Sequence, residues 1–95
     1  MMLKRKPTHP GEVLQKDVIE PLGMTTLEIA KRLGVSQNTL STLLKTHSSV
    51  TPEMAIRIGK ATRTTPESWL YMQAKYDLWI ATQKSFEVEE LIPAD

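Results

Sequence analysis

The chain is 95 residues long, which is enough for one small domain with a thin hydrophobic core. It has no cysteine, so disulfide bonds and zinc sites built on thiolates are excluded. The net charge of +1 hides an uneven distribution: residues 1–63 carry ten basic and five acidic side chains, whereas residues 64–95 carry two and six. A basic body is typical of contact with nucleic acid, and an acidic end suits a basic partner.

Targeting signals are not evident in the sequence. No apolar run approaches the roughly 20 residues that a membrane span needs. The basic N-terminus is not followed by the apolar stretch of a signal peptide. We therefore expect a soluble, cytoplasmic protein that does not contact a membrane, and oligomerisation as the support for its thin core.

The first two predicted helices are recognised from their end signals. One spans about residues 11–20 and is expected to end at Pro21 and Gly23. The next begins after Thr25, whose hydroxyl can cap it, and ends at Gly34 in a left-handed conformation.

Three further helices follow, each beginning after a hydroxyl residue. Ser36 caps the third, Thr51 the fourth and Thr65 the fifth, which extends to about Gln83 and is apolar on more than one face. No segment alternates with the period of a strand, so the prediction is an all-α fold of five helices. We divide the chain into a basic arm, a helical domain and an acidic tail, residues 1–10, 11–83 and 84–95.

The decisive stretch is Thr26–Thr46, two short helices joined by a tight turn. Ala30 is small where the helices must cross, and Gly34 supplies the positive φ that the turn needs. Aliphatic residues of the two helices and the turn are expected to pack together on the inner side of the motif: Ile29, Leu33, Val35, Leu40 and Leu43. An ordinary αα-hairpin also uses these residue types, but it needs no exposed face of amides and hydroxyls such as this second helix carries. The pattern predicts a helix-turn-helix.

Residues 11–82 resemble the Xre/Cro class of phage-repressor domains, and within that class the HigA/VapI family of antitoxins. The resemblance is carried by motifs in the family's order: His9-Pro10-Gly11-Glu12, Glu20-Pro21-Leu22-Gly23-Met24, Glu28-Ile29-Ala30, Leu33-Gly34-Val35-Ser36, Thr51-Pro52, Ala55-Ile56-Arg57-Ile58, Pro66-Glu67-Ser68-Trp69-Leu70 and 73–79 (QAKYDLW). It implies a lambda repressor-like fold, a repressor that binds operator DNA, and a toxin partner, a small basic ribonuclease of the HigB type.

The second helix of the motif is the predicted recognition helix. Its first two turns present amides and hydroxyls that can read base edges in the major groove, Gln37, Asn38, Ser41 and Thr42. Hydroxyls and backbone N–H groups at helix starts, together with one lysine, are expected to contact phosphates, through Thr25, Thr26, Ser36 and Lys45. Lys4, Arg5 and Lys6 form an arm that could reach DNA or simply aid solubility.

One recognition helix covers too few base pairs for a repressor, so we predict a homodimer. The fifth helix offers two apolar stripes. The first is our predicted interface, Trp69, Met72, Tyr76 and Trp79; the second comprises Leu70, Ala74, Leu78 and Ala81. The alternative assigns all of these residues to the core of the monomer.

Two other functional classes were weighed against this prediction. An enzyme is disfavoured because Asp17, His47 and the serines lack a nucleophile-elbow or metal-ligand spacing, so we expect no catalysis, cofactor or metal. A protein-binding module that neutralises a toxin, with DNA binding secondary, is the second class. A free-standing Xre-type regulator without a toxin partner is the remaining alternative.

Overall fold

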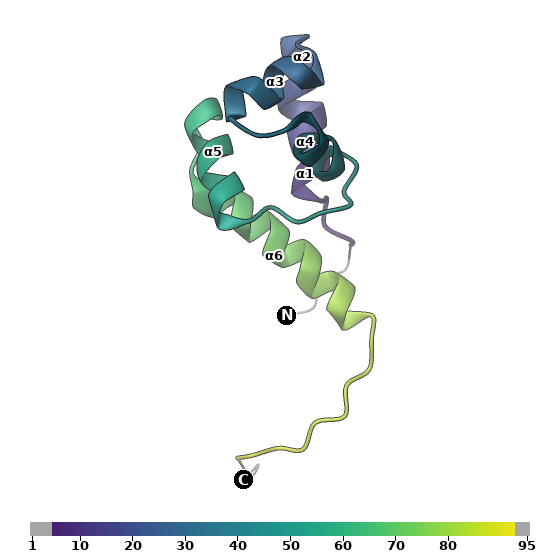
Figure 1. Ribbon diagram of the computed structural model, residues 1–95. Helices are drawn as coiled ribbons and strands as arrows, with labels where there is room; N and C mark the ends of the chain where they lie inside the picture. The colour runs from purple at the N-terminus through teal and green to yellow at the C-terminus, as the bar shows by residue number, and fades with distance from the viewer. Residues whose placement is uncertain (1–4, 93–95) are drawn as a thin grey trace.

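The computed structural model describes residues 5–92, and within this range the regular structure is entirely helical. Five helical rods follow one another along the chain, the first of them built from three continuous pieces (Figure 1). The bounds are α1 Pro10–Val13, η1 Leu14–Ile19 and α2 Glu20–Leu22, then α3 Thr26–Leu33, α4 Gln37–Leu44, α5 Pro52–Thr62 and α6 Pro66–Thr82. The predicted all-α fold is confirmed. Lys4 of the predicted arm lies outside the described residues.

The first rod continues through Pro21, so the prediction that Pro21 ends it is wrong. Its middle section, η1, is a π-helix, in which the N–H of Glu20 donates to the carbonyl of Gln15. Proline needs no backbone acceptor, and the wider turn leaves its ring room beside the preceding carbonyls. The rod ends instead at Gly23, whose φ is 68°.

The predicted helix caps are all present. In each case a hydroxyl accepts a hydrogen bond from the N–H three residues later, at 3.0–3.2 Å. The pairs are Thr25 with Glu28, Ser36 with Thr39, Thr51 with Met54 and Thr65 with Ser68. These local bonds explain why four of the five helix starts could be located from the sequence.

The core lies where the first rod, α3, α4 and α5 meet, and the start of α6 closes it. Leu40 and Ile58 are fully buried at its centre, and Ala30 is 1% exposed where α3 approaches α4. Gly11 lies directly against the backbone of α4: a Cβ added there would collide with the carbonyl oxygen of Leu43. The helix-turn-helix is therefore held on a packed base and presents α4 at one side.

The long helix α6 belongs to the core only at its beginning. Trp69 is buried, and the Gln73 side chain accepts from the N–H of Val50 at 2.8 Å and donates to Asp77 at 3.0 Å. Beyond this point α6 extends away from the body, and residues 84–92 continue outward without regular structure (Figure 1). None of the described helices is long and apolar enough to cross a membrane.

Candidate nucleic-acid interface

The turn of the helix-turn-helix fixes the start of α4. Gly34 ends α3 with a φ of 74°, and the N–H of Val35 donates to the carbonyl of Ala30 at 3.0 Å. The chain then extends through Ser36, which caps α4. Gly34 thus places the recognition helix immediately after α3.

The four predicted base-reading residues lie on one side of α4. Helical periodicity groups Gln37, Asn38, Ser41 and Thr42 opposite the buried Leu40 and Leu43. Gln37 and Asn38 are exposed, whereas Ser41 and Thr42 are half-buried. The Thr42 hydroxyl donates to the carbonyl of Asn38 at 2.8 Å, which leaves its methyl group and its acceptor lone pairs for a ligand.

The predicted phosphate-contacting residues divide into two groups. Thr25, Thr26 and Ser36 lie at the starts of α3 and α4, where helix N–H groups favour an anion, and Lys45 lies exposed at the other end of α4. The Ser36 hydroxyl already accepts from the N–H of Thr39 and donates to its Oγ1 at 2.8 Å. The donors available to an anion at the start of α4 are therefore its first backbone N–H groups rather than the Ser36 hydroxyl.

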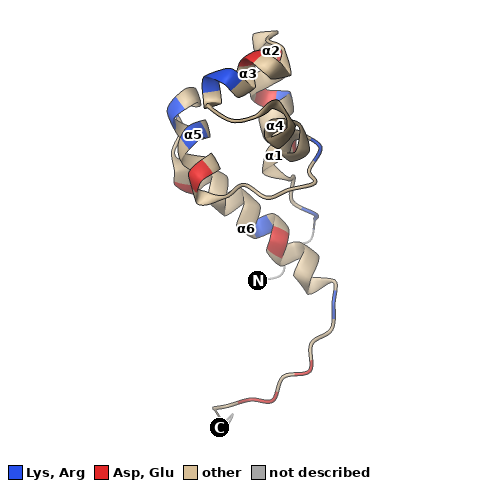
Figure 2. Ribbon diagram, in the orientation of Figure 1, with Lys and Arg blue, Asp and Glu red and all other residues tan. Residues whose placement is uncertain are grey.

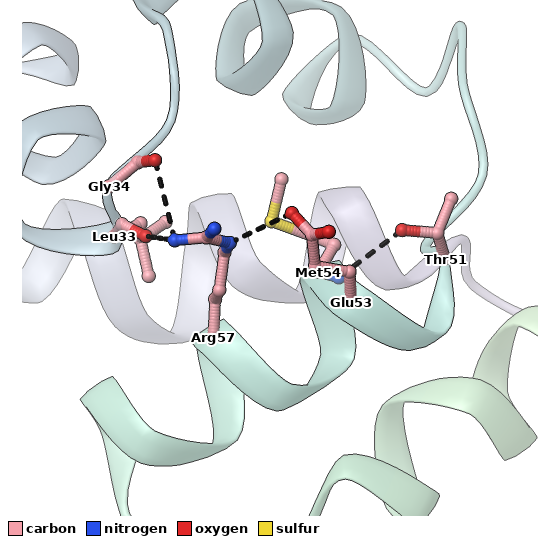
Figure 3. Close-up of polar contacts among 6 residues, drawn as sticks. All are labelled: Leu33, Gly34, Thr51, Glu53, Met54 and Arg57. Atoms are coloured by element: carbon pink, nitrogen blue, oxygen red, sulfur yellow. Dashed lines mark hydrogen bonds and ion pairs between the residues drawn. The ribbon is translucent and has the colours of Figure 1, made fainter.

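Arg57 of α5 holds the turn between α3 and α4 in place, a contact that the sequence does not predict. Its guanidinium reaches from α5 to α3, where Nη1 donates to the carbonyls of Leu33 at 3.0 Å and Gly34 at 3.4 Å (Figure 3). Its Nε donates to Glu53 at 3.2 Å, one turn earlier on α5. The spacing of Glu53 and Arg57 signals only the local ion pair. The contact across 24 positions of sequence depends on the tertiary fold.

The predicted dimer stripe on α6 mostly faces its own chain. Trp69 is 3% exposed and its Nε1 donates to the Thr64 hydroxyl at 2.7 Å, so its assignment to a dimer interface is wrong. Met72 packs partly buried against the core. Tyr76 and Trp79 are half-buried, with the Lys6 ammonium 5.4 Å and 5.8 Å from their ring centroids.

The opposite side of α6 is the one that is open. Tyr71 is 65% exposed and Leu78 is 61% exposed, two turns apart on the same side as Ala74. The second apolar stripe of the sequence contained Ala74 and Leu78 but not Tyr71. Apolar side chains on both sides of α6 made the inner and outer stripes indistinguishable by periodicity.

His9 caps the start of α1. Its Nδ1 accepts from the N–H of Gly11 at 2.9 Å, and its ring meets the edge of Tyr76 at a centroid distance of 4.8 Å. Burial lowers the pKa of His9, although the Ser48 backbone and nearby acids favour its charged form. Among residues 5–92 no group of three His, Asp or Glu side chains could hold a metal ion.

Comparison with known proteins places this geometry in a family. The helix-turn-helix family matches residues 16–70. An uncharacterized HTH-type transcriptional regulator of Haemophilus influenzae is 44% identical over 82% of the chain and 73% of its own length. Antitoxin HigA-1 of Vibrio cholerae is 40% identical, over 80% and 71% respectively.

Solved structures share the same architecture. Antitoxin GraA in complex with its operator matches with a TM-score of 0.80 and 33% identity, over 88% of this chain and 85% of that one. Pseudomonas aeruginosa antitoxin HigA with the higBA promoter matches with a TM-score of 0.81 and 28% identity, over 90% and 99%.

Proposed function

Because the chain belongs to the helix-turn-helix family and is a DNA-binding regulator related to the HigA and GraA antitoxins, we propose that it represses its own operon as the antitoxin of a HigBA-type module. In this proposal it acts in the cytoplasm as a homodimer, binds operator DNA through α4, and neutralises a ribonuclease toxin. It has no catalytic role of its own.

The observation that carries the DNA-binding part is the first turn of α4. Gln37 and Asn38 are exposed there, beside a helix N-terminus whose first N–H groups can bind a phosphate. Amide side chains suit adenine N6 and N7. Thr25 and Thr26 begin α3, and Lys45 supplies a charge at the far end of α4. Two of the solved relatives are complexes with operator or promoter DNA, which supports this use of the surface.

We assign the dimer contact to the outer side of α6. A twofold axis perpendicular to α6, near residues 74 and 75, would bring Tyr71 of one protomer against Leu78 of the other. Ala74 at the centre is small enough to let the helices approach closely. Met72, Tyr76 and Trp79 would then support the interface from its border, with their inner sides on the core and the arm.

The toxin part of the proposal is supported by the relatives called antitoxins and by the separation of charge along the chain. Figure 2 shows basic residues at the end of α3 and along α5, and acidic residues in the segment after α6. A basic toxin would bind acidic surface of this protein that lies away from α4, so one dimer could bind DNA and toxin at the same time. A free-standing regulator is the second candidate.

The test of DNA binding compares amide deletions on two helices. Gln37→Ala and Asn38→Ala should each weaken binding to DNA from upstream of the protein's own gene by about 1–3 kcal/mol, which is about 5- to 150-fold in Kd. Gln15→Ala removes an amide from η1 and should leave both affinity and footprint unchanged. Parental footprints for the α4 variants would remove Gln37 and Asn38 from the recognition surface.

The test of the antitoxin role uses the product of the adjacent gene. Adding that product to the protein–operator complex in a gel-shift titration should give a slower band, and co-expression should rescue growth from its toxicity. Displacement of the operator would show that the two ligands share one surface. If the product neither binds nor inhibits growth, the chain is a free-standing regulator.

A further inference from the structure

A groove between α3 and α5 combines positive charge with exposed apolar surface. It has a volume of about 530 Å³, and we call it the basic groove. Its lining includes Arg32, Glu53, Ile56, Arg57, Lys60 and Ala61 but no residue of α4. A ligand in the basic groove would therefore leave the predicted base-reading side chains uncovered.

The cations of the basic groove differ in how far they are already engaged. Arg57 is held by the two α3 carbonyls and by Glu53. Arg32 has only an exposed ion pair with Glu28, 3.3 Å long, which contributes little and exchanges easily. Lys60 forms no ion pair within residues 5–92. Arg32 on α3 and Lys60 on α5, which line the groove together with the exposed Ile56, are the charges available to a ligand.

The segment after α6 has the complementary chemistry. Residues 86–92 read Phe-Glu-Val-Glu-Glu-Leu-Ile, three carboxylates interleaved with apolar side chains. Every residue of this segment is exposed, with Val88 at 84% and Leu91 at 99%. So much apolar surface in an extended segment is typical of a peptide that binds elsewhere. Its acids match the cations of the basic groove, and its apolar residues match Ile56 and Ala61.

The direction of α6 indicates which copy of the chain supplies that peptide. α5 ends beside the start of α6, since a Cβ added to Gly59 would lie 3.2 Å from the backbone nitrogen of Pro66. From there α6 runs for 17 residues, about 25 Å at 1.5 Å per residue. Glu87 lies five residues beyond Thr82 and Ile92 lies ten, so an extended segment could return about 17 Å and about 34 Å respectively, at about 3.4 Å per residue. Binding in the basic groove of its own chain would require the segment to reverse direction at the end of α6, where it leads away from the body (Figure 1), and to run back along that helix.

We propose that residues 86–92 of one protomer bind in the basic groove of a second copy. An antiparallel pairing of the two α6 helices would place the end of one beside the start of the other, and hence beside Lys60. The exchange is reciprocal, so each dimer would contain two such contacts. This inference rests on the proposed α6 dimer and adds an acid–base clasp to it, while α4 stays free for DNA. A basic toxin that bound the acidic segment would have to displace it from the basic groove.

Paramagnetic labelling tests the clasp directly. The chain has no cysteine, so Val88→Cys gives a single site for a nitroxide in the full-length protein. Spin-labelled chains at natural isotope abundance are mixed with ¹⁵N-labelled parental chains, so that only contacts between copies are detected. The amide signals of Ile56, Lys60 and Ala61 should broaden and recover when ascorbate reduces the label.

Charge reversal supplies the matched control. Lys60→Glu in the ¹⁵N-labelled chain should abolish the broadening, whereas Lys16→Glu, the same charge change on η1, should preserve it. Broadening only when label and isotope share a chain, or no broadening in the groove, would overturn the proposal. Sedimentation equilibrium of the same mixtures separates the two levels: a dimer without broadening refutes the clasp alone, and a monomer refutes the α6 dimer as well.

Discussion

Replacing Arg57 by methionine should cost the protein about 2 kcal/mol of unfolding free energy. The change keeps most of the side-chain volume but removes the donors to the Leu33 and Gly34 carbonyls, at 3.0 Å and 3.4 Å. A hydrogen bond from a charged group contributes about 1.5–3 kcal/mol. The Arg57 side chain is 38% exposed and its second bond is long, so the lower part of that range applies.

The ion pair with Glu53 accounts for little of this loss, and Glu53→Gln is the matched control. The Glu53 side chain is 76% exposed, and exposed ion pairs of this kind contribute about 0.2–1 kcal/mol. Glu53→Gln should therefore cost at most about 0.5 kcal/mol. The carbonyl contacts matter more because α3 ends there with acceptors that no later N–H of the helix satisfies.

Urea denaturation followed by tryptophan fluorescence measures both variants. With an m-value of about 1.5 kcal/mol per molar, Arg57→Met should lower the midpoint by about 1.3 M. All proteins are compared at one concentration, since a dimer's stability depends on it. Equal losses for the two variants would assign the effect to the ion pair. A loss below about 0.5 kcal/mol for Arg57→Met would show that water serves these carbonyls as well as Arg57 does.

Three further outcomes follow from other contacts. Gly11→Ala should destabilise the fold by roughly 2 kcal/mol or more, as in an overpacked core, because the added Cβ meets the Leu43 carbonyl, whereas Gly23→Ala is strained only by its φ of 68° and should cost about 1 kcal/mol. Thermal melts that rank the two variants the other way would contradict the close approach of Gly11 to α4. Because the folded-state pKa of His9 is lowered from 6.5, its stabilising contribution is present above pH 6.5 and is lost as the pH falls through the lowered pKa. His9→Asn keeps a capping acceptor and should flatten this part of the pH–stability curve; an unchanged curve would show that His9 is not the group responsible. Leu78→Asp should give a folded monomer by circular dichroism and sedimentation equilibrium, and an unaltered dimer would place the interface elsewhere.

Four helix starts and the turn between α3 and α4 could be predicted from the sequence. Thr25, Ser36 and Gly34 act through bonds and dihedral angles within a few residues of their own position, so their residue types carry the information. The buried aliphatic residues of α3 and α4 recur with the helical period and face the core as predicted. Pro21 is the local exception, because a π-helix removed the conflict that normally ends a helix at proline.

The roles of α6 and Arg57 depend on contacts between helices that are far apart in the sequence. Apolar residues surround α6, so periodicity could not tell that Trp69 faces the core while Tyr71 and Leu78 stay open. That choice depends on where the first rod, α5 and the arm pack against α6. Arg57 has an ordinary i, i+4 partner in Glu53, yet its stronger contacts are carbonyls on another helix. Backbone carbonyls are the same in every residue, so no sequence pattern marks them as the acceptors, and only the folded chain brings them within reach.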